Sequence, residues 1–386
     1  APKGYNQTEI GLIPEDWKVL NLGNTSVLKA RIGWQGLTTD EYLEDGEYYL
    51  ITGTDFKNGY IDWDNCVFVE ENRYNQDKNI QIKENDILVT KDGSIGKIAF
   101  IRNIPKKTTL NSGVFVIRPL LNNYHPKYFY FILTSRYFKE FLGKLIAGST
   151  ISHLYQKDFI YFDFPLPPSL QEQKAIAQVL SDTDDLIQSI KSLIDKKKAI
   201  KQGAMQELLI GKTRLEGFTE EWETKTLEEV AVIQRGASPR PISNPIWFDD
   251  KSTVGWVRIS DVTKSIKFLF RTTQKLSEQG INSSRFVSSE NLIMSICATI
   301  GRPIITKINV CIHDGFVVFK DLRIQKEFLY YFLSFIEDDW SKNGQTGSQM
   351  NLNTGLINRT EIKYPINLEE QQAIAQILSD MDLEIE

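Results

Sequence analysis

The chain has 386 residues, of which 41% are hydrophobic and 11% aromatic, so it can build more than one buried core. Its formal net charge of −5 excludes a generally basic protein, and any polyanion must be met by local patches or with the help of a partner. No apolar run is long enough to cross a membrane, and the three cysteines and three histidines lack metal-ligand spacing. We therefore expect a reduced cytoplasmic protein that holds no metal.

Residues 1–168 predict a first globular unit of mixed α and β structure. Apolar strand segments lie at 86–90 and 113–116, and an aromatic-rich run follows at 128–133. The proline-rich stretch 165–168 ends this unit, because proline lacks a backbone donor and fixes φ.

A long helix is predicted next. Ser169 stands at the N-cap position and Glu172 follows three residues later, which is the pattern of a capping box. Apolar residues then recur every seven positions, which is typical of a helix that packs against another helix. We predict one helix from Ser169 to about Leu209, roughly 60 Å long, with Gly211 as its stop.

The second half of the chain repeats the first in the same order. The strand segments recur at 291–295 and 315–318, and the helix start 170–182 recurs almost unchanged at 368–380. Trp17 has its counterpart in Trp222, and we interpret both as packing residues. The apolar positions agree while the loops differ, so two equal scaffolds with unequal loops are expected to recognise two different targets.

The second helix begins after Asn367, which repeats the cap with Glu370, and it ends at Glu386 after about half the length of the first. Each helix leaves its own unit toward the other, so the two should pack antiparallel. The predicted fold is α+β, with pseudo-two-fold internal symmetry. Its two similar globular domains, 1–168 and 212–366, are joined by the helices 169–211 and 367–386, which form an antiparallel two-helix coiled coil. The residues predicted at the helix–helix interface are Ile176, Val179, Leu186, Ile190, Leu193, Ile200, Ile374, Ile377, Leu378 and Met381.

Several stretches of the chain resemble a type I restriction–modification specificity subunit. They are 7–17 at the entry to the first unit, 165–187 at the start of the long helix, 202–212 at its exit, and Arg240-Pro241-Ile242 in the second unit. The resemblance covers the whole chain, and the order and duplication of these motifs make it specific. The short second helix departs from the family pattern.

The resemblance implies that each globular unit is a target-recognition domain for one half of a bipartite, asymmetric DNA sequence, with the helices setting the gap. Two methyltransferase subunits would bind and flip out an adenine for N6-methylation from S-adenosylmethionine. Restriction subunits that use ATP and Mg would join the complex to cut unmethylated DNA. The specificity subunit itself would have no catalytic residue and no cofactor.

Candidate DNA-contacting residues come from the polar loops of each unit. Arginine pairs well with guanine and glutamine with adenine, while lysine suits phosphate. The candidates are Lys29, Arg31, Trp34, Gln35, Thr54, Lys57, Lys91, Ser94, Lys97, Ser149 and Thr150 in the first unit, and Arg235, Ser238, Arg240, Arg258, Thr299, Arg302, Ser348 and Gln349 in the second. Plain strand-connecting turns remain the alternative for these loops.

Two other functions stay open from the residues alone. A two-headed scaffold for proteins or glycans would also use unequal loops on equal scaffolds, and the acidic charge balance allows it. A self-contained DNA methyltransferase or nuclease is disfavoured, because no glycine-rich cofactor loop accompanies the chain.

Overall fold

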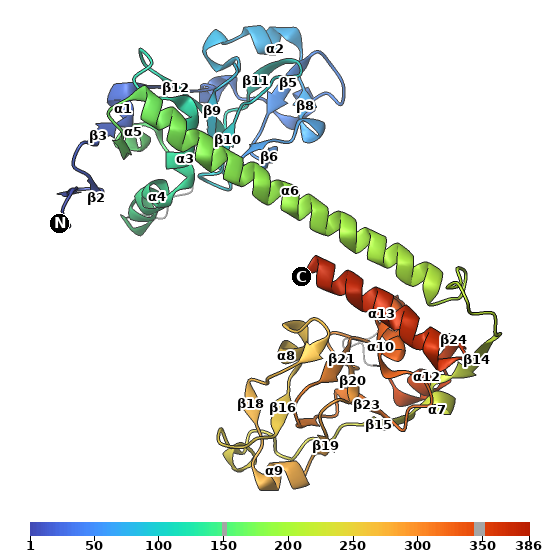
Figure 1. The fold of residues 1–386 in the computed structure, drawn as a ribbon. Coiled ribbons are helices and arrows are strands. Elements are labelled where there is room, and N and C mark those ends of the chain that lie inside the picture. The colour runs from blue at the N-terminus through green and yellow to red at the C-terminus, as the bar shows by residue number, and fades with distance from the viewer. Residues whose placement is uncertain (149–152, 343–351) are drawn as a thin grey trace. The chain divides into compact units, whose positions relative to one another are not determined.

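The computed structural model describes residues 1–148, 153–342 and 352–386, apart from the side chains of Trp34, 146–148 and 341–342. The chain forms two compact units, Ala1–Gln188 and Ser189–Glu386, each of mixed α and β structure (Figure 1). The predicted α+β class is confirmed. Within the described ranges, none of the helices has the length and apolar character that crossing a bilayer requires.

Unit 1 contains strands, α-helices and short 3-10 helices (η) in alternation. Its strands are β1 (Tyr5–Thr8), β2 (Gly11–Pro14), β3 (Lys18–Asn21), β4 (Ser26–Ala30), β5 (Tyr48–Ile51), β6 (Phe56–Lys57), β7 (Tyr60–Ile61), β8 (Val67–Phe68), β9 (Ile87–Thr90), β10 (Ile98–Phe100), β11 (Lys107–Leu110), β12 (Val114–Pro119) and β13 (Asp163–Leu166). Its helices are α1 (Leu22–Thr25), η1 (Gly33–Gln35), η2 (Thr39–Glu41), η3 (Trp63–Asn65), α2 (Glu71–Asn75), η4 (Lys78–Ile80), α3 (Pro126–Thr134), α4 (Arg136–Gly148), α5 (Gln156–Phe159) and the first half of α6 (Leu170–Leu208).

Unit 2 begins within α6 and repeats the order of the central strands of unit 1. Its strands are β14 (Trp222–Thr226), β15 (Val232–Arg235), β16 (Gly255–Val257), β17 (Phe268–Leu269), β18 (Gln274–Lys275), β19 (Arg285–Val287), β20 (Leu292–Ser295), β21 (Pro303–Thr306), β22 (Val310–Ile312), β23 (Phe316–Lys320) and β24 (Glu361–Pro365). Its helices are α7 (Leu227–Val230), η5 (Pro245–Trp247), α8 (Ile259–Thr263), α9 (Glu278–Asn282), α10 (Lys326–Phe335), α11 (Glu337–Lys342), α12 (Thr354–Arg359) and α13 (Leu368–Ile385).

Each unit has two main sheets that share one plan, together with smaller two-stranded sheets. In unit 1 the orders are β10-β9-β12-β4 and β11-β5-β8, and in unit 2 they are β15-β23-β20-β21-β17 and β18-β16-β22-β19. The central strands β9, β12, β20 and β23 are almost wholly buried apolar residues, which suits strands covered on both faces. The parallel pairs β5–β11 and β16–β22 occupy matching places in the second sheets.

The long helix α6 begins and ends where the sequence predicts. The hydroxyl of Ser169 accepts a hydrogen bond from the backbone N–H of Glu172 at 3.1 Å, which caps the first turn. At the other end Gly211 has a φ of 70°, and its N–H donates to the carbonyl of Leu208 at 3.4 Å. A left-handed glycine in this place is a common helix stop, so both predicted ends are confirmed.

A buried glutamine explains much of the repeated helix sequence. In α6 the amide oxygen of Gln173 accepts from the N–H of His125 at 2.8 Å, and its amide nitrogen donates to the carbonyl of Pro167 at 3.2 Å. In α13 Gln371 makes the same two bonds, with the N–H of Gln325 at 2.6 Å and the carbonyl of Pro365 at 2.8 Å. Each glutamine therefore ties a helix to its globular core.

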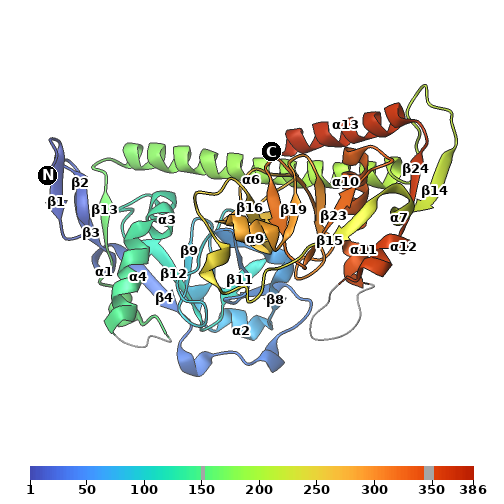
Figure 2. The same ribbon diagram turned by 90° about the horizontal axis from the view of Figure 1, so that it is seen from below.

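Within unit 2, α13 packs antiparallel against the second half of α6 (Figure 2). Lys197 pairs with Glu384 and Lys201 pairs with Asp382, so residue numbers fall along one helix as they rise along the other. Ile374 and Leu378 are buried in the same apolar cluster as Met205 and Leu208, with Ile377 and Met381 at its margin. The predicted antiparallel pairing is present in this unit.

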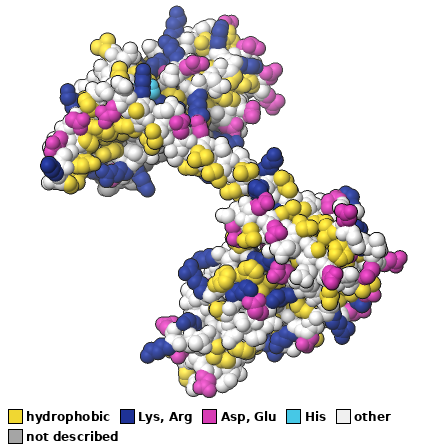
Figure 3. Space-filling view, viewed as in Figure 1, with side chains coloured by type: hydrophobic (Ala, Val, Ile, Leu, Met, Phe, Trp, Pro, Cys, Tyr) yellow, Lys and Arg dark blue, Asp and Glu magenta, His cyan; other side chains and the backbone are white. Residues whose placement is uncertain are grey.

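The α6–α13 contact uses a different face of α6 from the predicted one. Ile200 remains 53% exposed, because α13 lies over the stripe that carries Lys197, Lys201, Ala204, Met205 and Leu208. Ile190 and Leu193 are 47% and 52% exposed, and they precede the Lys197–Glu384 pair at the end of α13. In unit 1, Val179 and Leu186 are exposed as well, while Ile176 packs partly against the core. Figure 3 shows apolar side chains gathered along the surface of α6.

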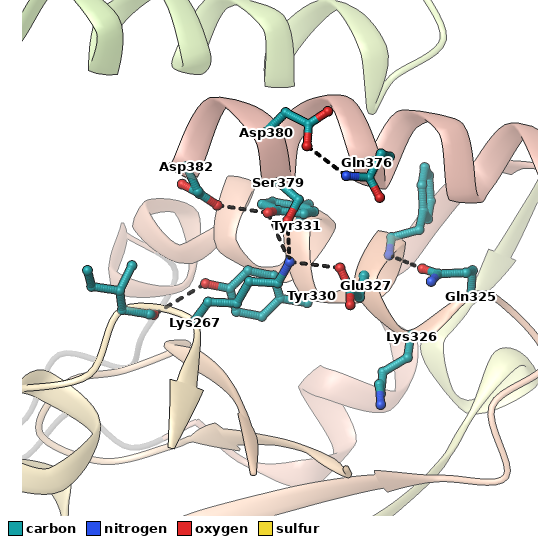
Figure 4. Close-up of polar contacts among 12 residues, drawn as sticks. Lys267, Gln325, Lys326, Glu327, Tyr330, Tyr331, Gln376, Ser379, Asp380 and Asp382 are labelled. Atoms are coloured by element: carbon teal, nitrogen blue, oxygen red, sulfur yellow. Dashed lines mark hydrogen bonds and ion pairs between the residues drawn. The ribbon is translucent and has the colours of Figure 1, made fainter. Parts of the chain in front are cut away.

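A buried lysine ties α13 to the sheet region of unit 2. Lys267, just before β17, donates to Glu327 at 2.7 Å, to the hydroxyl of Ser379 at 3.1 Å and to that of Tyr331 at 3.2 Å (Figure 4). Tyr331 in turn donates to Asp382 at 2.8 Å. In unit 1 the matching serine, Ser181, accepts instead from Lys127 of α3.

Candidate nucleic-acid interface

In unit 1, three strand ends meet around the turn 111–113, which joins β11 to β12. The N–H of Asn111 donates to the carbonyl of Ile51 at the end of β5, and the N–H of Lys91 after β9 donates to the carbonyl of Gly113, both at 2.9 Å. The end of β4 is adjacent, because Ala30 pairs with Phe115 at the start of β12. The loops after β4, β5 and β9 therefore open from one edge.

Unit 2 has the same edge around the turn 313–315, which joins β22 to β23. The N–H of Ile296 after β20 donates to the carbonyl of Gly315 at 2.8 Å, and Arg235 at the end of β15 pairs with Val317. The end of β16 lies beside this turn, because Val257 pairs with Ile312. We call these two places the unit 1 edge and the unit 2 edge.

An aspartate shapes the same loop on both edges. In unit 1 the carboxylate of Asp55 accepts from the N–H of Thr52 at 2.6 Å, and in unit 2 Asp261 accepts from the N–H of Arg258 at 2.9 Å. Both aspartates are buried. Each closes a turn directly after the parallel strand and leaves Thr52 or Arg258 at the edge.

The unit 2 edge carries a hollow of about 690 Å³. Its lining includes Arg240, Arg258, His313 and Asp314, together with the indole of Trp256. Arg258 is held by a 2.8 Å hydrogen bond from its Nε to Gln274, whereas Arg240 is exposed at the rim. Two cations and one carboxylate around this hollow suit a polar, partly anionic ligand such as nucleic acid.

Two titratable groups of the unit 2 edge, Asp314 and His313, have pKa values shifted from their ordinary values. A hydrogen bond from the hydroxyl of Ser238, 2.6 Å long, holds the pKa of Asp314 below its ordinary value. Burial lowers the pKa of His313, so its imidazole is neutral at neutral pH. The Nδ1 of His313 accepts from the N–H of Gly315 at 2.9 Å, which places the proton on Nε2.

The unit 1 edge is chemically different. Asp92 pairs with His153, while Lys91 lies over the ring of Phe115 with its Nζ 5.3 Å from the centroid. Nζ of Lys97 donates to the carbonyl of Gly53 at 3.3 Å, which links the loops after β9 and β5. Lysines and a histidine–carboxylate pair therefore replace the arginines of unit 2.

A comparison with known protein families identifies these two units. The family model of the type I restriction modification DNA specificity domain matches residues 14–199 and again 219–386. The chain belongs to this family. A specificity subunit is the non-catalytic DNA-recognition component of a type I restriction–modification complex and needs no cofactor of its own, and this member carries two target-recognition domains.

Individual relatives agree with this assignment. The chain is 27% identical to the putative type I restriction enzyme MjaX specificity subunit of Methanocaldococcus jannaschii, over 98% of this chain and 90% of the relative. It is 26% identical to the EcoKI specificity subunit of Escherichia coli K12, over 55% of this chain and 45% of that one. The crystal structure of the type I S subunit from M. genitalium superposes with a TM-score of 0.61 at 16% identity, covering 96% and 90% of the two chains, which supports the fold.

The structure excludes one predicted DNA-contacting residue of this specificity subunit. Arg31 is 1% exposed, and its guanidinium donates to the carbonyl of Leu110 at 2.8 Å and to the hydroxyl of Thr109 at 3.1 Å. Further bonds reach Gln76 and the carbonyl of Arg73. The prediction of a DNA contact is wrong for Arg31, because these buried acceptors hold its donors inside the domain.

The other predicted residues fall into three groups. Five predicted residues are exposed at the unit 1 edge or on its loops, namely Lys29, Thr54, Lys57, Ser94 and Lys97. Lys91 and Gln35 are half-buried. Four predicted residues lie at the unit 2 edge, namely Arg235, Ser238, Arg240 and Arg258. Arg302 instead donates to the carbonyl of Ser265, and Thr299 lies in the loop after β20 that also carries Arg302. The side chain of Trp34 and residues Ser149, Thr150, Ser348 and Gln349 lie outside the described part of the chain.

Sequence reasoning missed the turn residues His313 and Asp314, which the structure places on the unit 2 edge. It also missed His153, which pairs with Asp92 on the unit 1 edge. The sequence did contain a signal for these turns. The matched apolar segments 113–116 and 315–318 are preceded by different polar residues in the two halves. That signal becomes visible once the two halves are aligned at their glycines, Gly113 and Gly315.

Proposed function

We propose that this specificity subunit reads a bipartite, asymmetric DNA sequence, with one half-site at the edge of each unit. The observation that carries the proposal is the pair of matched edges. The same strand ends and backbone hydrogen bonds recur, yet Asn111 and Ser112 of unit 1 stand where unit 2 has His313 and Asp314. Equal frames with unlike side chains are what two different half-sites require.

The DNA-contacting groups in this proposal are the exposed and half-buried cations of the two edges. Lys29, Lys91 and Lys97 would neutralise phosphates in unit 1, and Arg240 and Arg258 would meet phosphate or guanine in unit 2. The net charge of −5 leaves much of the phosphate neutralisation to partner subunits. Tight DNA binding is therefore expected of the complex rather than of the isolated chain.

The helices would set the gap and carry the partners. In this proposal, 1–168 and 212–366 are the recognition domains, and 169–211 and 367–386 are the spacer. The exposed apolar residues of α6, such as Val179 and Leu186, favour docking of a protein partner, because an exposed apolar stripe at heptad spacing is suited to another helix. That partner would be a pair of methyltransferase subunits that supply S-adenosylmethionine, through which ATP- and Mg-dependent restriction subunits join.

The test is to co-express the chain with its cognate methyltransferase subunit and to map N6-methyladenine across the host genome. We expect methylation at one bipartite motif, which disappears when this chain is deleted. Methylation at no bipartite motif, or methylation that does not depend on the chain, would overturn the proposal.

A domain exchange tests the assignment of half-sites. Replacing 15–165 by the equivalent segment of another specificity subunit should change one half of the motif and leave the other half and the gap as they were. The matched control is the exchange of 220–365, which should change only the opposite half. A change in both halves after either exchange would contradict one half-site per unit.

A further inference from the structure

The turn 313–315 presents a carboxylate at the centre of the unit 2 edge. The Asp314 side chain is 50% exposed, and its Oδ1 accepts the hydroxyl hydrogen of Ser238 at 2.6 Å. This bond holds the pKa of Asp314 below its ordinary value, so the group is ionised at neutral pH. A fixed negative charge therefore lies on a surface that we assign to DNA.

The backbone around Asp314 is held firmly in place. Its own carbonyl accepts from the Nε of Arg235 at 2.8 Å, and the N–H of Phe316 closes the turn onto the carbonyl of His313 at 3.0 Å. Gly236 packs so closely that a Cβ there would lie 2.0 Å from the carbonyl oxygen of His313. The carboxylate is thus positioned by strand ends on both sides, as a direct reader of bases must be.

Among the described residues, no arginine or lysine donates a hydrogen bond to the carboxylate of Asp314. Arg235 bonds to the backbone carbonyl, and it favours the ionised form only by its nearby positive charge. The Nδ1 of His313 lies 3.9 Å from Oδ1, but it accepts from the N–H of Gly315 and carries no proton for Asp314. Ser238 is a neutral donor, and an asparagine or a serine at position 314 could accept its hydrogen bond equally well.

A carboxylate on a DNA-binding edge restricts what it can face. It repels phosphate and the acceptor atoms of guanine and thymine, and it gains only from a donor. In the major groove, the donors on base edges are the exocyclic amino groups, and aspartate is suited to N4 of cytosine. Arg240 and Arg258 flank the same hollow and offer donors to the complementary guanine or to phosphate.

The matched position in unit 1 is Ser112, whose hydroxyl lies 3.4 Å from the Oδ1 of its neighbour Asn111. A neutral hydroxyl donates and accepts, so it discriminates weakly among base edges. The same place on the shared frame thus carries an acceptor-only group in one unit and a permissive group in the other.

We propose that Asp314 is a specificity-determining residue that accepts a hydrogen bond from the exocyclic amino group of a base, a cytosine in the major groove, within the half-site read by unit 2. The inference rests on the proposed function and adds a base class to it.

The test compares Asp314→Asn and Asp314→Ser with wild type in the reconstituted complex of this chain and its methyltransferase subunit. Methylation rates are measured on a duplex library that varies every position of the half-site assigned to unit 2 by the domain exchange. We expect wild type to require a cytosine at one position. Both variants should lose about tenfold or more of that preference while the remaining positions keep theirs. Ser112→Ala is the matched control and should leave the unit 2 half-site unchanged.

Three other results would contradict the proposed role of Asp314. An unchanged preference at every position of the unit 2 half-site would show that Asp314 reads no base. Equal loss of methylation on all sequences would show a structural role, and hydrogen exchange of 310–320 in Ser238→Ala would then show the same loosening as in the Asp314 variants. If wild type methylates no bipartite site at all, the proposed function fails, and this inference fails with it.

Discussion

The unit 1 and unit 2 edges share a backbone plan and differ in how the plan is stabilised. In unit 1, Arg31 follows β4 and fills the space behind the edge with a buried guanidinium that bonds to β11. In unit 2 the equivalent residue is Gly236, and the chain itself closes against the carbonyl of His313. One frame thus tolerates both a side-chain strut and direct backbone packing.

The attachment of the helices shows the same contrast. Gln173 and Gln371 make identical bonds in the two units, but the acidic residue next to them differs in its surroundings. Glu172 is half exposed and accepts from the indole of Trp17 at 3.2 Å, whereas Glu370 is fully buried and takes two bonds from Arg214 at 2.7 and 2.8 Å. The repeated sequence is therefore a common anchor, and its energetic weight depends on local burial.

The largest expected loss of stability comes from a substitution that disrupts this anchor in unit 2 alone. Arg214→Met should destabilise unit 2 by about 4 kcal/mol, because the carboxylate of Glu370 stays buried without its bidentate partner. The loss of stability is measured by hydrogen exchange of α13 and of β14 and β24, which pair antiparallel, with unit 1 peptides as internal reference. Lys212→Met, which removes an exposed ion pair with Glu207 on the same tether, is the control and should change nothing measurable. Equal effects of the two variants would contradict the buried anchor.

The next effect concerns the strut of unit 1. Arg31→Ala should destabilise unit 1 by about 3 kcal/mol, since the carbonyl of Leu110 and the hydroxyl of Thr109 lose a charged donor while remaining buried. Faster exchange should appear in β4, β11 and β12 while unit 2 stays protected. Lys29→Ala, which changes an exposed residue near the end of β4, serves as the control. Unchanged protection in Arg31→Ala together with weakened DNA binding would restore the original prediction of a DNA contact.

A smaller loss of stability is expected from substituting the lysines that bond to the helices, and it should differ between Lys267 in unit 2 and Lys127 in unit 1. Lys267→Met should cost about 2 kcal/mol in unit 2, because Glu327 loses its cation and the hydroxyls of Tyr331 and Ser379 lose a buried contact. Lys127→Met in unit 1 removes a single bond to Ser181 and should cost less than about 1 kcal/mol. Urea unfolding followed by exchange of α6 and α13 measures both. A larger loss from Lys127→Met would reverse the comparison.

The smallest effect is a pH dependence. Burial lowers the pKa of His313, so the unfolded chain takes up its proton first as pH falls, and unit 2 loses stability from neutral pH toward pH 5. His313→Asn, which installs the unit 1 residue, should remove that part of the loss, amounting to less than about 1 kcal/mol. His125 in unit 1 has a pKa lowered by burial too, so unit 1 should keep its own pH dependence in this variant. Exchange rates of 310–320 at pH 7 and pH 5 decide the point, and an identical pH profile in both proteins would refute it.

The sequence by itself determined the duplication, the α+β class, the long helix with its ends at Ser169 and Gly211, and the family. These features rest on local signals, namely periodicity, caps, proline and glycine, which act between residues close in the chain. The apolar strand segments were likewise visible, because a central strand needs apolar residues whatever its neighbours are.

The tertiary structure alone decided which polar residues stay inside and which reach the edges. Arg31 looked like a surface cation until β11, far along the chain, supplied buried acceptors for it. Asp314 looked like an ordinary turn residue until Ser238 and Arg235 were brought beside it. The face of α6 that meets α13 also differed from the heptad stripe, because Met205 and Leu208 share an apolar cluster with Ile374 and Leu378 while Ile200 stays exposed. Such outcomes depend on approach between distant segments, which spacing within one segment does not encode.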